Sequence, residues 1–245
     1  MSLASIAHEI SRTLRPPAGE RHGPLPPLML ALTFVTGVVD AASYLKLGHV
    51  FVANMTGNVV FLGFAIAGAG GLSITSSLTA IAAFLVGAFA GGQLVTRTAE
   101  HRGRMLRGAS LLQSVFVLGA LALALLGSEP PSTAARYALL VLLALSMGVQ
   151  NAAAQRLAIP ELTTTVLTRT LTGLASEARQ AGSSGSQLGR RLLAVAAMLL
   201  GALSGALLVL DVSIAAALLP ACAVVLAVAL AVHLLSRADA AWARA

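Results

Sequence analysis

The chain has 245 residues, of which 57% are hydrophobic and 10% are charged, and its mean hydropathy is +0.87. A soluble domain carries about a quarter charged residues, so this composition excludes a soluble globular protein and predicts an integral membrane protein with several spans. The formal net charge of +7 does not indicate nucleic-acid binding, because no basic run is interleaved with aromatic residues. We therefore expect no nucleic acid among the partners.

Residues 1–27 are expected to form a cytoplasmic tail that ends in a Pro-rich linker. They contain no apolar core of the kind found in signal peptides, so we do not expect a signal peptide here. A single transmembrane domain is expected over residues 28–235, with Asp211 as the cap of its last span, and residues 236–245 form a second cytoplasmic tail. Six apolar segments, each near the roughly 20 residues that span a bilayer, lie at residues 28–48, 74–95, 106–127, 135–155, 192–210 and 214–235.

Two shorter or more polar segments lie at residues 54–70 and 163–176, after the first and the fourth span. The distribution of arginine indicates that neither segment crosses the membrane. If both termini are cytoplasmic and these segments do not cross, 13 of the 16 basic residues lie on the cytoplasmic side, as the positive-inside rule requires. The predicted fold class is therefore an all-α integral membrane protein with six transmembrane helices and two short partial helices.

The partial segments belong to an internal repeat, in which each copy consists of a span, a partial helix and two further spans. The first copy covers about residues 28–127 and the second about residues 135–235. Because each copy crosses the membrane an odd number of times, the second copy is upside down relative to the first. The sequence thus predicts two inverted-topology repeats, an arrangement found in many transporters. The matched pairs are Gly37 with Gly148, Asp40 with Asn151, and Thr56 with Thr168 once one extra residue is allowed.

Three polar motifs within these apolar segments form a recognisable set. They are Thr36-Gly37-Val38-Val39-Asp40-Ala41-Ala42-Ser43-Tyr44, Asn54-Met55-Thr56-Gly57-Asn58, and Gly148-Val149-Gln150-Asn151-Ala152 with Thr164-Thr165-Val166-Leu167-Thr168. The set resembles the YoaK family of bacterial multi-pass membrane proteins over residues 28–235. One position departs from the expected pattern, since Arg169 stands where a glycine matching Gly57 is expected. The resemblance implies a bacterial inner-membrane protein and supplies no catalytic or ligand residues.

Asp40 is the strongest candidate for a functional residue. It lies about 12 residues into the first span, roughly 18 Å along the helix. A charged Asp at this depth costs about 2.5–3.5 kcal/mol on insertion scales, so it should pair, stay protonated or face a cavity. One interpretation makes Asp40 a coupling or gating carboxylate. The other makes it a structural cap at the break before the partial helix.

Further polar residues near the two partial segments are candidates for ligand contacts. Asn54 and Thr56 precede an apolar helix and are expected to cap it, which satisfies N–H groups that lipid cannot satisfy. Arg169 stays charged, so we expect it either to face Asp40 or to snorkel to the cytoplasmic interface. Asn151 is expected to serve as interhelical hydrogen-bonding glue or as a ligand contact. The full candidate set is Asp40, Ser43, Tyr44, Asn54, Thr56, Asn58, Asn151, Thr168 and Arg169.

The motifs of common enzymes are missing from the sequence. It has no HExxH, no Gly-x-Ser-x-Gly and no phosphate-binding glycine-rich loop, so we expect no enzyme, no metal and no cofactor. The favoured interpretation is a transporter or facilitator of a small polar or anionic solute in the inner membrane, with the lipid bilayer and that solute as partners. The alternative is a non-transport membrane protein that serves in assembly, in sensing or as a scaffold.

Overall fold

The computed structural model describes most of the chain, with its longest gap between the fourth and fifth spans. The second partial segment, predicted at residues 163–176, lies in that gap apart from Thr172. Within the described residues the chain is helical and contains no strand. The described residues are 3–17, 19–96, 98, 100–160, 162, 172, 188–236 and 241–243.

Six of the described helices are long and apolar enough to cross a membrane, as the sequence predicted. A short helix, α1 (Leu3–Leu14), precedes them, α3 (Met55–Ile66) follows the first span, and the turn η1 (Ala241–Ala243) lies near the C-terminus. The six spans are α2 (Leu25–Lys46), α4 (Ile74–Thr96), α5 (Arg102–Leu126), α6 (Thr133–Leu157), α8 (Leu188–Asp211) and α9 (Ile214–Leu235).

Local sequence determines where several of these helices begin. Proline occupies the first turn of α2, where the missing N–H has no helical partner to lose. Ser132 caps α6, and Ser213 caps α9 by accepting a hydrogen bond from the backbone N of Ala216. The prediction that Asp211 caps α9 is therefore wrong. A cap must directly precede the first helical residue, whereas Asp211 is the last residue of α8.

The two helices that carry the polar motifs, α2 and α6, are at the centre of the bundle. Of their most apolar stretches, 67% is buried, against 28% for α4 and 22% for α8. The outer helices expose large apolar side chains, such as Phe89 on α4 and Leu199 on α8. In a bilayer these side chains contact acyl chains, and the buried polar groups of α2 and α6, such as Asp40 and Gln150, stay away from lipid.

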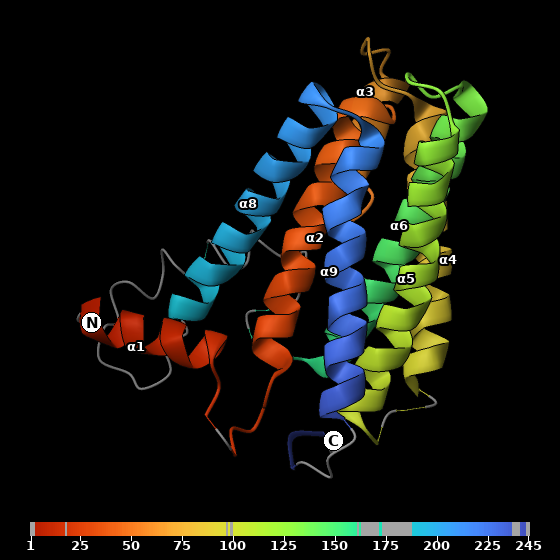
Figure 1. Ribbon diagram of the computed structural model, residues 1–245. Coiled ribbons are helices and arrows are strands. Elements are labelled where there is room, and N and C mark those ends of the chain that lie inside the picture. The colour runs from red at the N-terminus through yellow and green to blue at the C-terminus, as the bar shows by residue number, and fades with distance from the viewer. Residues whose placement is uncertain are drawn as a thin grey trace.

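Figure 1 shows that the spans run alternately up and down. Both chain ends lie at one end of the bundle, called here the lower end, and α3 lies at the opposite, upper end. α2 runs upward while α6 runs downward, and the same reversal relates α4 to α8 and α5 to α9 (Figure 1). α1 lies across the lower end and packs on α8. Corresponding helices of the two halves thus have opposite directions.

Glycines bring α2 against α8 and α4 against α6 at backbone contact. A Cβ atom at Gly37 would overlap the carbonyl oxygen of Met198 on α8, and one at Gly148 would overlap that of Phe84 on α4. Each of these contacts joins one helix from each half of the chain, in matching register, which supports the predicted inverted repeat. The same match recurs at Gly87 and Gly201, which face the carbonyl oxygens of Leu145 and Phe34, and at Gly91 and Gly205, which face Val149 and Val38.

Candidate functional site

The carboxylate of Asp40 holds the loop that follows α2. Its Oδ1 accepts hydrogen bonds from the backbone nitrogens of Val52 at 2.9 Å and Ala53 at 2.8 Å, and the residue is 4% exposed. Asp40 lies roughly 9 Å below the end of α2, so residues 47–54 must turn back into the bundle to reach it. α3 then begins at this depth. Its 12 residues extend about 18 Å, too short to cross a core of about 30 Å.

Two asparagines fix the same loop from the α3 side. The side chain of Asn58 is fully buried and pairs with the backbone of Phe51 in both directions. Its Nδ2 donates to the carbonyl oxygen at 2.6 Å, and its Oδ1 accepts from the backbone nitrogen at 2.8 Å. Asn54 is the N-cap of α3 and accepts from the backbone nitrogen of Gly57 at 3.4 Å, as predicted. Thr56 lies one residue inside the helix and is exposed, so the cap is Asn54 alone.

Aromatic side chains pack beside the loop in a chain that has few aromatic residues. The ring of Tyr44 stacks on Phe51, with centroids 5.2 Å apart, and lies 5.9 Å from the ring of Phe61. His49 meets Tyr44 edge-on at 5.4 Å. Ser43 is buried, and its hydroxyl donates to the backbone oxygen of Asp40 at 3.1 Å. These contacts account for Ser43 and Tyr44 as parts of the loop's support.

A line of buried polar side chains crosses the middle of the bundle from α5 through α6 to α2. Gln113 Nε2 donates to Gln150 Oε1 at 2.6 Å, and Gln150 Nε2 donates to Thr36 Oγ1 at 2.8 Å. None of the three is more than 3% exposed. We call Thr36, Gln113 and Gln150 the central amide network. Sequence reasoning missed Gln113, although an amide in the middle of an apolar span was a signal that could have identified it.

A cavity of about 450 Å³ lies between α4 and α6, beside Asn151. It extends along α6 toward the lower end, where Arg156 lines it. Its polar lining comes from Asn151, Gln155, Arg156 and Thr96. The other lining residues are small or apolar, as in Ala88 and Gly92. The volume lies within the range of small-molecule sites. We call this space the α4–α6 cavity.

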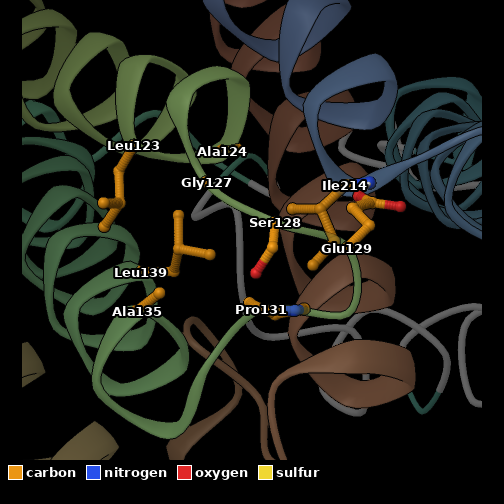
Figure 2. A pocket seen from close by; sticks show the side chains of 9 residues that line it. All are labelled: Leu123, Ala124, Gly127, Ser128, Glu129, Pro131, Ala135, Leu139 and Ile214. Atoms are coloured by element: carbon orange, nitrogen blue, oxygen red, sulfur yellow. Dashed lines mark hydrogen bonds between the residues drawn. The ribbon is translucent and has the colours of Figure 1, made fainter.

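A second cavity lies at the upper end, between α5, α6 and the start of α9 (Figure 2). Its volume is about 10 Å³, which holds about one water molecule and no larger solute. Glu129 lies beside Ile214 in Figure 2, and Glu129 Oε1 accepts from the backbone nitrogen of Ile214 at 2.7 Å. Glu129 thereby satisfies an N–H group at the start of α9, and the space beside it is a packing gap.

The structure divides the predicted candidates between two places. The residues of the first repeat gather at the loop after α2, whereas Asn151 lies in the second repeat and lines the α4–α6 cavity. Thr168 and Arg169 lie outside the described residues, so the pairing of Arg169 with Asp40 stays a prediction. In the part of the chain that the structure describes, no three His, Cys, Asp or Glu side chains gather as a metal site requires.

A comparison with known proteins identifies the family of this chain. A family model described as "Protein of unknown function (DUF1275)" matches residues 28–231, a range that includes most of all six spans. The chain belongs to this family. It is also 36% identical to the UPF0700 transmembrane protein YoaK of Bacillus subtilis (strain 168) over 148 residues, which are 60% of this chain and 64% of that relative. The match thus spans less than two thirds of the relative. No solved structure matches.

Proposed function

We propose that this protein is a transporter or facilitator of a small polar or anionic solute. The observation that carries the proposal is the α4–α6 cavity, which lies next to the central amide network through the adjacent residues Gln150 and Asn151. The amides of Asn151 and Gln155 line this open space, Gln155 at an exposed position, and Arg156 adds a positive charge near its lower end. Such groups replace the water that a polar solute loses on entering the membrane.

The way the spans pair supports movement of the protein around such a site. α2 is fixed to α8, and α4 to α6, by glycine contacts that exclude side chains. The hydrogen bond from Gln150 to Thr36 joins one pair to the other. Motion of one pair relative to the other would break this bond and would also shift the packing of α5 on α6 and of α9 on α2. Two inverted pairs that rock about a central polar contact provide alternating access.

The proposed location is the bacterial inner membrane, with the lower end in the cytoplasm. Arg12, Arg15, Arg102 and Arg104 all belong to the lower end, and basic residues collect on the cytoplasmic side. On the same proposal the protein is not an enzyme and binds no nucleic acid. Its partners are the bilayer and the solute.

The second candidate is a membrane protein that serves in assembly, sensing or as a scaffold. The observation that favours it is the hydrogen bonding of Asp40, whose carboxylate accepts from the backbone nitrogens of Val52 and Ala53. A carboxylate engaged by its own loop has a structural role without any solute. Asp40 would then be the cap of the re-entering loop and not a coupling residue.

Untargeted metabolite uptake in cells with and without the protein separates the two candidates. Transport predicts that one or more polar metabolites differ in accumulation, and that Gln155→Leu lowers the initial rate about tenfold because a polar contact is lost. Gln93→Leu is the matched control, since Gln93 is an exposed amide on α4 outside the cavity lining. If no metabolite differs in accumulation between the two kinds of cell, or if both variants reduce uptake equally, the scaffold is favoured. Asp40→Asn should abolish concentrative uptake if Asp40 couples transport.

A further inference from the structure

Basic side chains gather at the lower end of the bundle around His22, in the loop before α2. Arg102, the first residue of α5, places Nη2 3.3 Å from Nδ1 of His22. The same nitrogen donates to the carbonyl oxygen of Leu157, the last residue of α6, at 2.9 Å. Arg102 therefore ties the loop to two of the spans.

Two more guanidinium groups lie near this pair. Burial lowers the pKa of His22, and the charges of Arg102, Arg190 and Arg21 lower it further. The imidazole is thus held in the neutral form, whose Nδ1 can accept a hydrogen bond from Arg102. Arg21 is an exposed neighbour of His22, and Arg190 lies in the first turn of α8. The loop before α2, helix α5 and helix α8 therefore each contribute one guanidinium group near His22.

The positive charge around His22 exceeds the negative charge beside it. Glu20 is near enough to raise the pKa of His22, but its carboxylate is paired with Arg12. The carboxylate of Glu9 accepts a hydrogen bond from the backbone nitrogen of Gly189 at 3.0 Å. In addition, the Nε of Arg190 is enclosed and has no hydrogen-bond partner in the structure. The cluster formed by Arg21, Arg102 and Arg190 therefore offers donors to an anion.

Trp242 places this cluster at the membrane surface. A Cβ atom at Gly23 would overlap the indole ring, and one at Gly103 would lie 3.3 Å from it. Gly23 follows His22 and Gly103 follows Arg102, so the ring lies next to both members of the hydrogen-bonded pair. Tryptophan is enriched at the level of lipid headgroups, where its ring is partly in apolar surroundings.

We propose that Arg21, Arg102 and Arg190, together with His22, bind a phosphate group at the lower end of the bundle. Guanidinium groups bind phosphate through pairs of charge-assisted hydrogen bonds, and arginines near a membrane surface attract anionic lipids. An anionic phospholipid headgroup and a free phosphate ion present the same chemistry. The site is separate from the α4–α6 cavity and does not depend on whether a solute is transported.

The fluorescence of Trp242, the single tryptophan of the chain, tests the proposal. The purified full-length protein in phosphatidylcholine nanodiscs is titrated with inorganic phosphate, and is separately reconstituted with rising fractions of phosphatidylglycerol. We expect a saturable change in emission in at least one series. Saturation by inorganic phosphate identifies a free anion, and saturation by phosphatidylglycerol alone identifies the headgroup. Arg21→Gln and Arg190→Gln should each raise the midpoint about tenfold, since each removes a charged donor.

Arg104→Gln is the matched control, because Arg104 is exposed on the same turn of α5 and undergoes the same change of charge. Its midpoint should stay within about twofold of the wild-type value, as expected for a screened surface charge. The proposal is overturned if neither series saturates, if Arg104→Gln matches Arg190→Gln, or if Arg21→Gln leaves the midpoint unchanged. Arg21 is exposed, so its substitution gives a folded protein even where Arg190→Gln does not.

Discussion

Asp40 is one of the side chains that allow irregular backbone to enter the membrane domain. The loop before α3 cannot satisfy its own N–H groups, and an unpaired N–H in hydrocarbon costs several kcal/mol. The carboxylate of Asp40 accepts from Val52 and Ala53 and so removes two such groups. In return, the two backbone dipoles offset the cost of burying an acidic side chain in the span. Loop and carboxylate stabilise each other.

Replacing Asp40 should therefore weaken the fold. Asp40→Ala leaves two buried donors without an acceptor, at about 1–3 kcal/mol each, so we expect the free energy of unfolding to fall by about 2–6 kcal/mol. Asp40→Asn keeps an oxygen in the position of Oδ1, which accepts both bonds, and should lose about half as much because a neutral acceptor forms weaker hydrogen bonds than a carboxylate. Denaturant unfolding of the purified protein in detergent measures both values.

Asp211→Ala provides the comparison, since Asp211 is an exposed acidic residue at the end of α8. Its substitution should change the free energy of unfolding by less than about 0.5 kcal/mol. If Asp40→Ala were no more costly than Asp211→Ala, the two hydrogen bonds would not support the loop, and Asp40 would be left with a functional role alone.

The sequence revealed some of these residues and concealed others for physical reasons. Asp40 and Asn54 were predicted because polar groups in apolar segments are conspicuous. The pairing of Gln113 with Gln150 could not be predicted, because the two residues are distant in sequence and only the packing of α5 on α6 brings the two amides together. The partners of Asp40 were also beyond prediction, because they are backbone N–H groups, which every residue except proline carries.

At the scale of helices, apolar length predicted the six spans to within a few residues. The length of an apolar segment is a local property of the sequence, so it can be recognised without knowledge of the fold. The choice of neighbours was not predictable, since the chain has 23 glycines and only some of them meet a facing carbonyl oxygen. Gly87 and Gly201 are two that do, on the two outer helices α4 and α8. Gly92, on the same helix as Gly87, faces open space.

Alanine substitutions should separate these classes of glycine. Gly87→Ala and Gly201→Ala each force a methyl group into a backbone contact, and we expect each to lower the free energy of unfolding by about 1–3 kcal/mol. The two losses should be similar, because the two contacts correspond in the inverted halves. Gly92→Ala should be neutral or slightly stabilising, since alanine favours the helix. Unfolding in detergent measures all three.

Three equal losses would show that helix flexibility, and not close packing, is the role of these glycines. A large loss at Gly87 together with none at Gly201 would count against the equivalence of the two halves.

For the whole molecule, the distribution of arginine predicts the orientation in the membrane. In a Cys222→Ala background, Ser128→Cys lies in the loop at the upper end and Ser11→Cys lies on α1 at the lower end, both at exposed positions. A membrane-impermeant maleimide should label Ser128→Cys in spheroplasts and should label Ser11→Cys only after lysis, because the proposed orientation places the basic end in the cytoplasm. The reverse pattern would contradict the proposed orientation.

The pairing of α2 with α8 also constrains how the chain is made. α2 emerges from the ribosome first among the spans, yet the helix that covers its glycine face is the fifth. During synthesis, α2 must therefore wait in the membrane, with its glycine face uncovered, until more than 200 residues have been translated. Neither half of the repeat can complete its own packing. The two halves must therefore assemble together, and a fragment that ends before α8 would leave the glycine face of α2 uncovered.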